Sequence, residues 1–331
     1  MNLRKSCLSA LLALFAAVAA QAEVIKIATT APDGTAWMKE MRAGAEAVKA
    51  RTEGRVEIKY YPGGVMGDSA TVQRKIKIGQ LQGGAFTGGE IANANPDVQA
   101  YSLPFLFRSQ AEVDAVRAKF DERVKAGFEK NGFVALGLSG GGFAYIMSTR
   151  EIKTRDELKA AKVWVPQGDF IAEIAFKSAG VTPISLPLAD VYTSLQTGLI
   201  DTAANTFAGA IAFQWHTKIK HIVDLPVSYV VGVMVVDKKA FDKVSAADQA
   251  VLRDEIGKAF VRLDQIGIED NTKAVDALKK QGIAIYEPSA DEIANWQKIG
   301  AESAKQITGE KSPSPEIISA IEAEIATVRK K

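Results

Sequence analysis

The segment KVWVPQGDFIAEIAFKSAGVTPISLPLADVYTSLQTGLIDTAANTF, from Lys162 to Phe207, is the most informative part of the chain about its fold. It begins with a short apolar strand at 162–166 and continues through a helix to a second strand at 181–187. A further helix starts after a proline and stops at Gly198, and the chain then returns to the sheet at 199–204. Strands that alternate with helices indicate right-handed βαβ crossovers and a mainly parallel sheet. The predicted fold class is therefore α/β.

The first half of the chain repeats this alternation. Apolar or alternating runs at 24–29, 56–60 and 83–87 are typical of strands, and helical patterns separate them. Another strand is expected at 133–138, followed by a glycine-rich turn. A second α/β unit then begins near Tyr145, so the sequence predicts two lobes.

A long amphipathic helix is expected after Ser245, where SAAD resembles a capping box, and no proline interrupts it before Lys280. A last helix starts at Ser314-Pro315. The chain has no low-complexity linker, so we expect strands that cross between the lobes to join them. The lobes are assigned to discontinuous ranges: 23–144 with 236–280 for lobe I, and 145–235 with 281–331 for lobe II.

A signal peptide is predicted at residues 1–22. The chain opens with basic Arg4 and Lys5, an apolar run shorter than the ~20 residues that span a bilayer, and an A-x-A site. We therefore expect export to the periplasm and cleavage after Ala22. Cleavage would remove Cys7, the only cysteine, and lower the formal charge from +2 to zero. A neutral chain gives no electrostatic reason for binding nucleic acid or an anionic membrane.

Motifs for catalysis, metals or cofactors are weak or missing. The segment GLSGGG (137–142) lacks both the G-x-G-x-x-G spacing and the Lys-Ser/Thr ending of a phosphate loop, so close backbone packing is the simpler interpretation. His216 and His221 are five residues apart, which does not place them on one helical face as a zinc pair requires. No G-x-S-x-G elbow is present. We therefore expect that the protein is not an enzyme and has no catalytic residue, no cofactor and no bound metal.

Four blocks along the chain resemble one known family, in the expected order and at the expected distances. They are PGGVMGD (62–68), LPFLF (103–107), the KVWVP strand, and LADVYTSLQTGLIDTAANT (188–206). Together they resemble the DctP-like solute-binding proteins of tripartite ATP-independent periplasmic (TRAP) transporters, over nearly the whole mature chain. The resemblance implies two lobes around a ligand cleft, with a long helix bracing both.

The resemblance also implies a function. Such receptors close on one solute and deliver it to a pair of membrane permease subunits. The expected partners are therefore a small-molecule ligand and a TRAP permease, with an accessory periplasmic protein as a further option and a monomer as the oligomeric state. Rival interpretations are a binding protein of another importer or sensor, and a periplasmic enzyme on the same scaffold.

Two positions in the Lys162–Phe207 segment match functional positions of the family. Asn205 matches an asparagine that hydrogen-bonds the ligand, and its alternative role is a turn residue after a strand. Trp164 stands where the family carries an arginine that grips a substrate carboxylate, and its alternative role is a core aromatic. Ala144 stands near a second family arginine, so this member is atypical in lacking both cations.

Further cleft candidates in the second lobe are Tyr145, Gln167, Phe170 and Phe207. Gln167 and Phe170 follow the Trp164 strand at a helix start, where ligands often bind. Packing at the crossover, in the core or between lobes is the alternative for Tyr145, Phe170 and Phe207.

In the first lobe the candidates are Trp37, Phe86, Thr87 and Glu90. Trp37 begins the helix after the first strand, and Phe86 and Thr87 end a strand near the expected cleft. Trp37 has a core role as its alternative, and Glu90 has the alternative role of a solvated loop carboxylate.

The missing arginines predict an unusual cargo. An arginine binds a carboxylate through two charge-assisted bonds, whereas a tryptophan offers an apolar face and one N–H donor. We therefore expect a mostly apolar ligand, such as an aromatic or acyl compound. The alternative is an organic acid held by another cation, for which Arg42 and Lys162 are the candidates.

Overall fold

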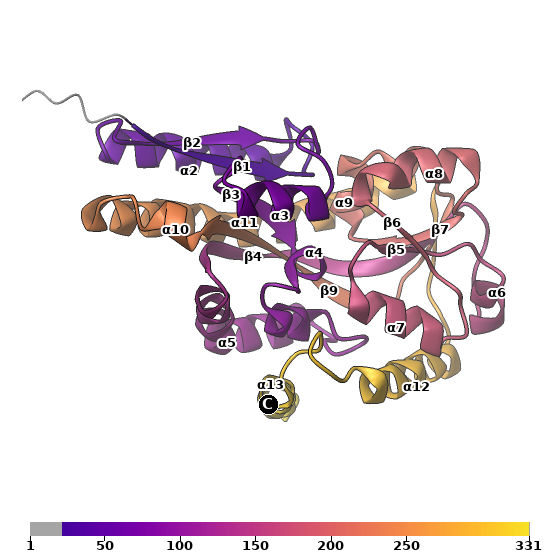
Figure 1. Ribbon diagram of the computed structural model, residues 1–331. Helices are drawn as coiled ribbons and strands as arrows, with labels where there is room; N and C mark the ends of the chain where they lie inside the picture. The colour runs from indigo at the N-terminus through magenta and orange to yellow at the C-terminus, as the bar shows by residue number, and fades with distance from the viewer. Residues whose placement is uncertain (1–21, 331) are drawn as a thin grey trace, which may run out of the picture.

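The computed structural model describes residues 22–330. Figure 1 shows two groups of elements side by side, the N-terminal strands and helices in one and the segment from α6 to α9 in the other. The predicted α/β fold with two lobes is confirmed. The predicted signal peptide lies outside the described residues, apart from Ala22 at its end.

The first lobe is built on three parallel strands. β1 pairs with β2 on one side and with β3 on the other, so that Ile27 lies opposite both Tyr60 and Gly83. Thr35 and Asp68 cap the helices that follow, each accepting a hydrogen bond from a first-turn backbone N–H. The elements of this lobe are β1 (Glu23–Thr29), α2 (Ala36–Arg51), β2 (Val56–Tyr61), α3 (Ser69–Lys77), β3 (Gly83–Thr87), α4 (Gly88–Ile91), η1 (Pro96–Ser102), α5 (Gln110–Lys130) and α10 (Lys238–Phe241).

The second lobe contains the elements of the Lys162–Phe207 segment. Two of its strands form a separate two-stranded parallel sheet, and Gly198 ends a helix with φ 72°, in the left-handed region that suits glycine. The elements are α6 (Arg155–Lys159), β5 (Trp164–Pro166), α7 (Phe170–Ser178), β6 (Ile184–Leu186), η2 (Leu188–Asp190), α8 (Val191–Thr197), β7 (Thr202–Asn205), α9 (Phe207–Ala212), η3 (Trp215–Thr217), β8 (His221–Val223), β10 (Ala284–Tyr286) and α12 (Ala290–Gln306).

Two long strands, β4 (Phe133–Ser148) and β9 (Ser228–Asp237), run through both lobes. β9 pairs with β3 of the first lobe, while β4 pairs with β7 and β8 of the second. All these pairings are antiparallel, as is the pairing of β4 with β9. The prediction of a mainly parallel sheet is thus wrong at the centre, because the crossing strands return in the opposite direction.

The glycine-rich segment is also not the turn that the sequence predicted. β4 continues through it, and its pairing with β9 shifts register once between Ala135 and Gly137 and again between Gly140 and Gly142. Gly142 has φ +110°, which only glycine adopts readily. Bulges of this kind bend and twist a strand without ending it. The glycines therefore carry one bent strand from lobe to lobe.

The long helix α11 (Ala246–Lys280) braces the molecule as expected. It packs on α2 in the first lobe, on β4 at the crossing and on α9 in the second lobe. Asn271 on this helix donates a 2.9 Å hydrogen bond to the Gly141 carbonyl and accepts a 3.0 Å bond from the Ala208 N–H. One side chain thus joins the helix to a crossing strand and to the second lobe.

A buried arginine fixes the same helix to the first lobe. The Arg117 guanidinium on α5, 8% exposed, is paired with Asp264 of α11 and donates to Asp121 at 2.9 Å. It also donates to the Leu138 carbonyl of β4 at 3.1 Å. Helix α5, strand β4 and helix α11 are therefore held by one side chain.

The C-terminal helix α13 (Pro315–Val328) packs on α5, through Ile317, Ile321 and Ile325. The sequence placed this helix in the range 281–331 of lobe II, whereas its packing partner lies in the range of lobe I. An isoleucine stripe shows that a helix buries one face but does not show which lobe receives it. The other lobe boundaries stay a prediction.

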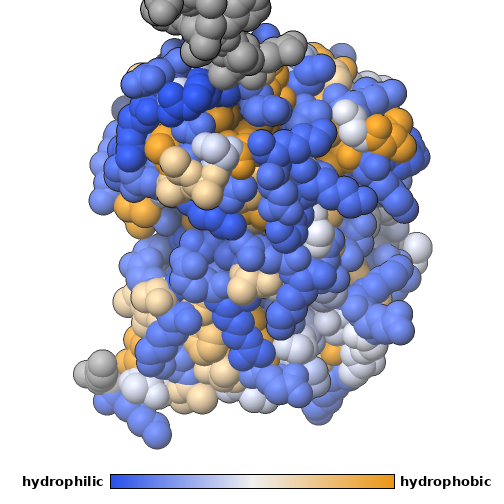
Figure 2. Space-filling model, turned by 60° about the vertical axis from the view of Figure 1, so that its left-hand side comes forward, coloured by the Kyte–Doolittle hydropathy of each residue, from blue (hydrophilic) through white to orange (hydrophobic). Residues whose placement is uncertain are grey.

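The surface carries both hydrophilic and hydrophobic residues. Figure 2 shows a face on which hydrophilic residues cover most of the area and hydrophobic ones appear in scattered places. No helix in residues 22–330 is long and apolar enough to cross a membrane.

Candidate ligand-binding site

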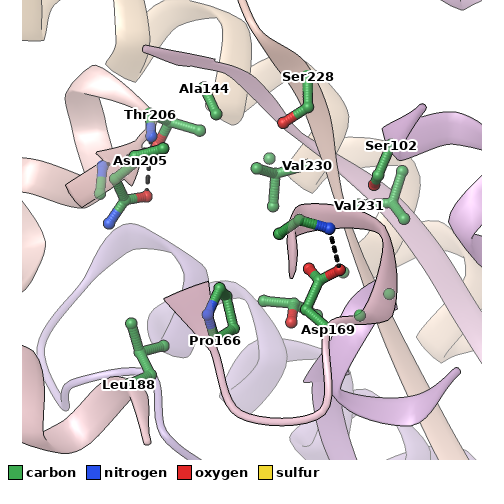
Figure 3. A pocket seen from close by; sticks show the side chains of 18 of the residues that line it. Ser102, Ala144, Pro166, Asp169, Leu188, Asn205, Thr206, Ser228, Val230 and Val231 are labelled. Atoms are coloured by element: carbon green, nitrogen blue, oxygen red, sulfur yellow. Dashed lines mark hydrogen bonds between the residues drawn. The ribbon is translucent and has the colours of Figure 1, made fainter. Parts of the chain in front are cut away.

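A cavity of about 390 Å³ lies between the lobes, within the usual size range of small-molecule sites. The first lobe contributes the start of α2, the end of β3 and α4. The second lobe contributes β5, α7, β7, α9 and α12, and the crossing strands and α11 complete the wall. In Figure 3, Asn205 and Thr206 lie on one side of this space and Asp169 and Pro166 on another.

Trp164 lines the cavity and belongs to the core of the second lobe. Its indole N–H donates to the Leu186 carbonyl at 2.9 Å, and its ring meets Trp215 edge-on at 5.4 Å. The residue thus lies both in the core and in the cavity wall, while its role in ligand binding stays a prediction, and its single donor is already used within the lobe. Trp164 offers the cavity an apolar surface only.

Asn205 ends β7 and also lines the cavity. Its Oδ1 accepts a 2.8 Å hydrogen bond from the Thr206 N–H, which is the turn role that the sequence offered as an alternative. Its Nδ2 donates to no described residue. The amide oxygen thus holds the turn, and the predicted hydrogen bond from this residue to a ligand stays a prediction.

The other predicted site residues divide into two groups. Trp37, Phe86, Thr87 and Glu90 line the cavity beside Trp164 and Asn205. The structure does not place Gln167, Tyr145, Phe170 and Phe207 in this wall; Gln167 lies instead in a small recess next to it, with Glu90.

The direction of Tyr145 follows from strand geometry. Its neighbours in β4, Ala144 and Ile146, both line the cavity, and successive side chains of a strand point to opposite faces. Tyr145 therefore points away and stacks on Phe207 at 4.2 Å between ring centroids. The pair supports the strand that carries Asn205, which lies opposite Tyr145 in the ladder.

The cavity wall carries no positive side chain. Among the described residues that line it there is no lysine, arginine or histidine, while Glu90, Asp169 and Asp270 are acidic. The two cations considered from the sequence lie elsewhere. Arg42 pairs with Asp33 at 3.0 Å, and the Lys162 ammonium donates to the Gly198 carbonyl at 2.9 Å. Ala144, which the sequence resemblance places near a second family arginine, also lines the wall.

Burial changes the titration of two of these acids. It raises the pKa of the Glu90 carboxyl, and the negative charge of Asp169 raises it further. Burial also raises the pKa of the Asp169 carboxyl. Both groups are half-buried and face the cavity, where bulk water screens their charge poorly.

Sequence reasoning missed an apolar arm of the cavity, between α7 and α12. Small residues of α7 leave the space open there, and Phe176, Trp296 and Ile299 close it. The small residues are Ala172 and Ala175 of α7 and Ala179 at its C-cap. Their spacing of three and four residues was visible as one helical face, but such a face normally indicates core packing.

No metal site appears in the described chain: residues 22–330 contain no group of three or more His, Cys, Asp or Glu side chains arranged to hold an ion.

Comparison with known families identifies the protein class. The model of the DctP family, described as "Bacterial extracellular solute-binding protein, family 7", matches residues 27–311. The chain belongs to this family. The predicted resemblance to TRAP solute-binding proteins is thereby confirmed, and the chain is a TRAP-type extracytoplasmic solute-binding receptor.

Relatives and solved structures agree with this assignment. A solute-binding protein of Verminephrobacter eiseniae is 26% identical, with 79% of each chain covered. The 2,3-diketo-L-gulonate-binding periplasmic protein YiaO of Escherichia coli is 24% identical, with 72% of this chain and 74% of that one covered. A TRAP periplasmic solute-binding protein of Desulfovibrio salexigens, solved with orotic acid, has a TM-score of 0.85 at 20% identity, covering 92% of this chain and 99% of that chain.

Proposed function

We propose that this receptor captures a small, largely apolar organic ligand in the periplasm and delivers it to a TRAP-type membrane permease. It acts as a monomer, and it encloses the ligand without changing it chemically. The observation that carries the proposal is the cavity wall, which is mostly apolar and has no lysine, arginine or histidine among the described residues.

Energetics favour an apolar cargo over a small organic anion. Burying a carboxylate without a cationic partner costs roughly 2–5 kcal/mol, which weakens binding by about 30-fold to several thousand-fold. Burying apolar surface contributes about 25 cal/mol per Å² instead. Trp164 and the arm between α7 and α12 supply such surface, and the Asn205 amide supplies an orienting polar contact.

The known ligands of related proteins make this a departure from the relatives. The Escherichia coli relative is named for 2,3-diketo-L-gulonate, and the Desulfovibrio salexigens structure holds orotic acid, so both bind organic acids. In this chain a tryptophan and an alanine stand where the family resemblance places arginines. We propose that these two replacements moved the specificity of the site.

Titration calorimetry on a ligand panel tests the proposal. Aromatic or acyl compounds are expected to bind at least about 30-fold more tightly than C4-dicarboxylates and sugar acids. Trp164→Ala is expected to weaken the binding of the apolar compounds, and Trp164→Phe, which keeps an aromatic face, less so. Submicromolar binding of a small dicarboxylate that Trp164→Ala leaves unchanged would refute the proposal.

Ligand capture is expected to close the lobes. In the described structure Gln99 of the first lobe donates a 2.9 Å hydrogen bond to Asp169 of the second, a contact that needs the lobes together. Small-angle scattering should therefore give a smaller radius of gyration with bound ligand than without. An unchanged radius in the presence of a saturating, tightly bound ligand would contradict this closure.

A further inference from the structure

Two carboxylates from different lobes, Glu90 and Asp169, line the cavity. Glu90 belongs to α4 of the first lobe, where its Oε2 accepts hydrogen bonds from the Thr87 N–H at 2.9 Å and the Thr87 hydroxyl at 3.2 Å. These bonds form a capping box. The second oxygen, Oε1, accepts no hydrogen bond from a described residue, so the cap uses one half of the carboxylate.

Asp169 is the counterpart in the second lobe. It caps α7 through Oδ1, which accepts from the Ala172 N–H at 3.0 Å and from the Gln99 amide at 2.9 Å. Its Oδ2 lies against α4, since a Cβ atom built on Gly89 would be only 2.3 Å from it. Glu90 is the next residue along that helix. Lobe closure therefore brings the two acids to one place.

A third observation lies beside this pair. Gln99 is fully buried, and its Oε1 has no hydrogen-bond partner among the described residues, although its Nε2 is bonded to Asp169. Buried side-chain acceptors are normally paired, and an orphan costs free energy. Gln99 does not line the cavity, so its orphan oxygen lies behind Asp169, and the acceptors that the cavity itself presents are the carboxylates of Glu90 and Asp169.

Resting on the proposed function, we infer that the ligand carries a protonated amine or another cationic nitrogen, which Glu90 and Asp169 hold between the closed lobes. Two like charges in a dry cavity repel each other and oppose closure, and either protonation of one carboxyl or a cation between them relieves the repulsion; a cation does so while both acids keep their charge. The cavity wall supplies none, and Asp270 of α11 adds a third acid. The ligand is the remaining source of positive charge.

The rest of the wall suits such a molecule. The aromatic residues Trp37 and Phe213 line the cavity, and aromatic faces attract cations within about 6 Å. The arm between α7 and α12 accepts an apolar body. The ligand class is therefore an amine with an aromatic or aliphatic body, rather than an organic acid.

Three probes that differ only in the polar end test this inference: 4-phenylbutylamine, 4-phenylbutan-1-ol and 4-phenylbutanoate. By calorimetry at neutral pH the amine should bind roughly tenfold or more tightly than the alcohol, as expected for one charge-assisted hydrogen bond. The carboxylate should bind most weakly.

Two substitutions separate charge from helix capping. Glu90→Gln keeps a residue that a capping box accepts, and Asp169→Asn keeps a good N-cap, so each removes a charge while the helix start is preserved. Each should reduce the preference for the amine over the alcohol to within about threefold. The matched controls are Glu157→Gln in the capping box of α6 and Asp237→Asn at the N-cap of α10, which lie outside the cavity wall and should leave the preference unchanged.

The outcomes distinguish this inference from the proposed function. Equal binding of amine and alcohol, in the parent protein and in Glu90→Gln alike, would overturn the inference while leaving an apolar ligand in place. Binding of the amine that both substitutions leave unaffected would also overturn it. Strong binding of C4-dicarboxylates with none of the three probes bound would refute the proposed function itself.

Discussion

Replacing Arg117 by alanine is expected to lower the free energy of unfolding by about 3–5 kcal/mol. Its guanidinium is the only cation that hydrogen-bonds the Asp121 and Asp264 side chains among the described residues, and it also holds the Leu138 carbonyl. The substitution leaves two neighbouring carboxylates without a positive charge. Urea denaturation followed by circular dichroism measures the change.

The matched control is Arg42→Ala, which breaks an exposed ion pair with Asp33 and should change stability far less.

Burial raises the pKa of the Asp121 carboxyl, so falling pH protonates it early and removes its charge. The loss in free energy of unfolding that Arg117→Ala causes, relative to the parent protein, should therefore become smaller as the pH is lowered. Equal stability of Arg117→Ala and Arg42→Ala at neutral pH would show that Arg117 does not fix α11 as described.

Gly137→Ala is expected to destabilise the protein by about 1–3 kcal/mol or more, through overpacking. A Cβ atom at Gly137 of β4 would lie 2.2 Å from ring carbons of Phe260 of α11, which is buried at 2% exposure. Neither the bent strand nor the buried ring has free space to move into. The same denaturation experiment measures the loss.

The control substitution should change the stability in the opposite direction. Gly257 lies on α11, the helix that carries Phe260, and a Cβ atom there meets nothing within 4 Å. Gly257→Ala should therefore stabilise the protein by roughly 0.5–1 kcal/mol, because alanine is the better helix former. Adding Phe260→Leu to Gly137→Ala should recover part of the loss, and a double variant as unstable as the sum of both singles would argue against this contact.

Most elements of the fold were readable from sequence because local signals agree with them. Thr35, Asp68 and Ser245 mark helix starts, and Gly198 marks a helix end. The crossing strand β4 was not readable as one element, since GLSGGG resembles a turn and only its antiparallel partner β9 makes it continuous. That pairing joins residues far apart in the chain, from Ala144 and Ser228, 84 apart, to Phe133 and Asp237, 104 apart, and periodicity carries no information about it.

The site was predictable where a motif positions the residue. Trp164, Asn205 and Glu90 were named from sequence and line the cavity. Asp169 was not named, although a helix start directly after a strand was visible, because an N-cap aspartate already has a structural role. The α12 wall was missed because Trp296 and Ile299 resemble ordinary core residues of an amphipathic helix.

A TRAP-type receptor that binds a largely apolar ligand without a cationic anchor should carry that ligand from the cells in which it is produced. The most direct test is a mass spectrum of the small molecule released on denaturing protein that was purified without added ligand. We expect a near-stoichiometric compound with an aromatic or acyl body that is neither a C4-dicarboxylate nor a sugar acid. A stoichiometric dicarboxylate or sugar acid released from the cavity would contradict it.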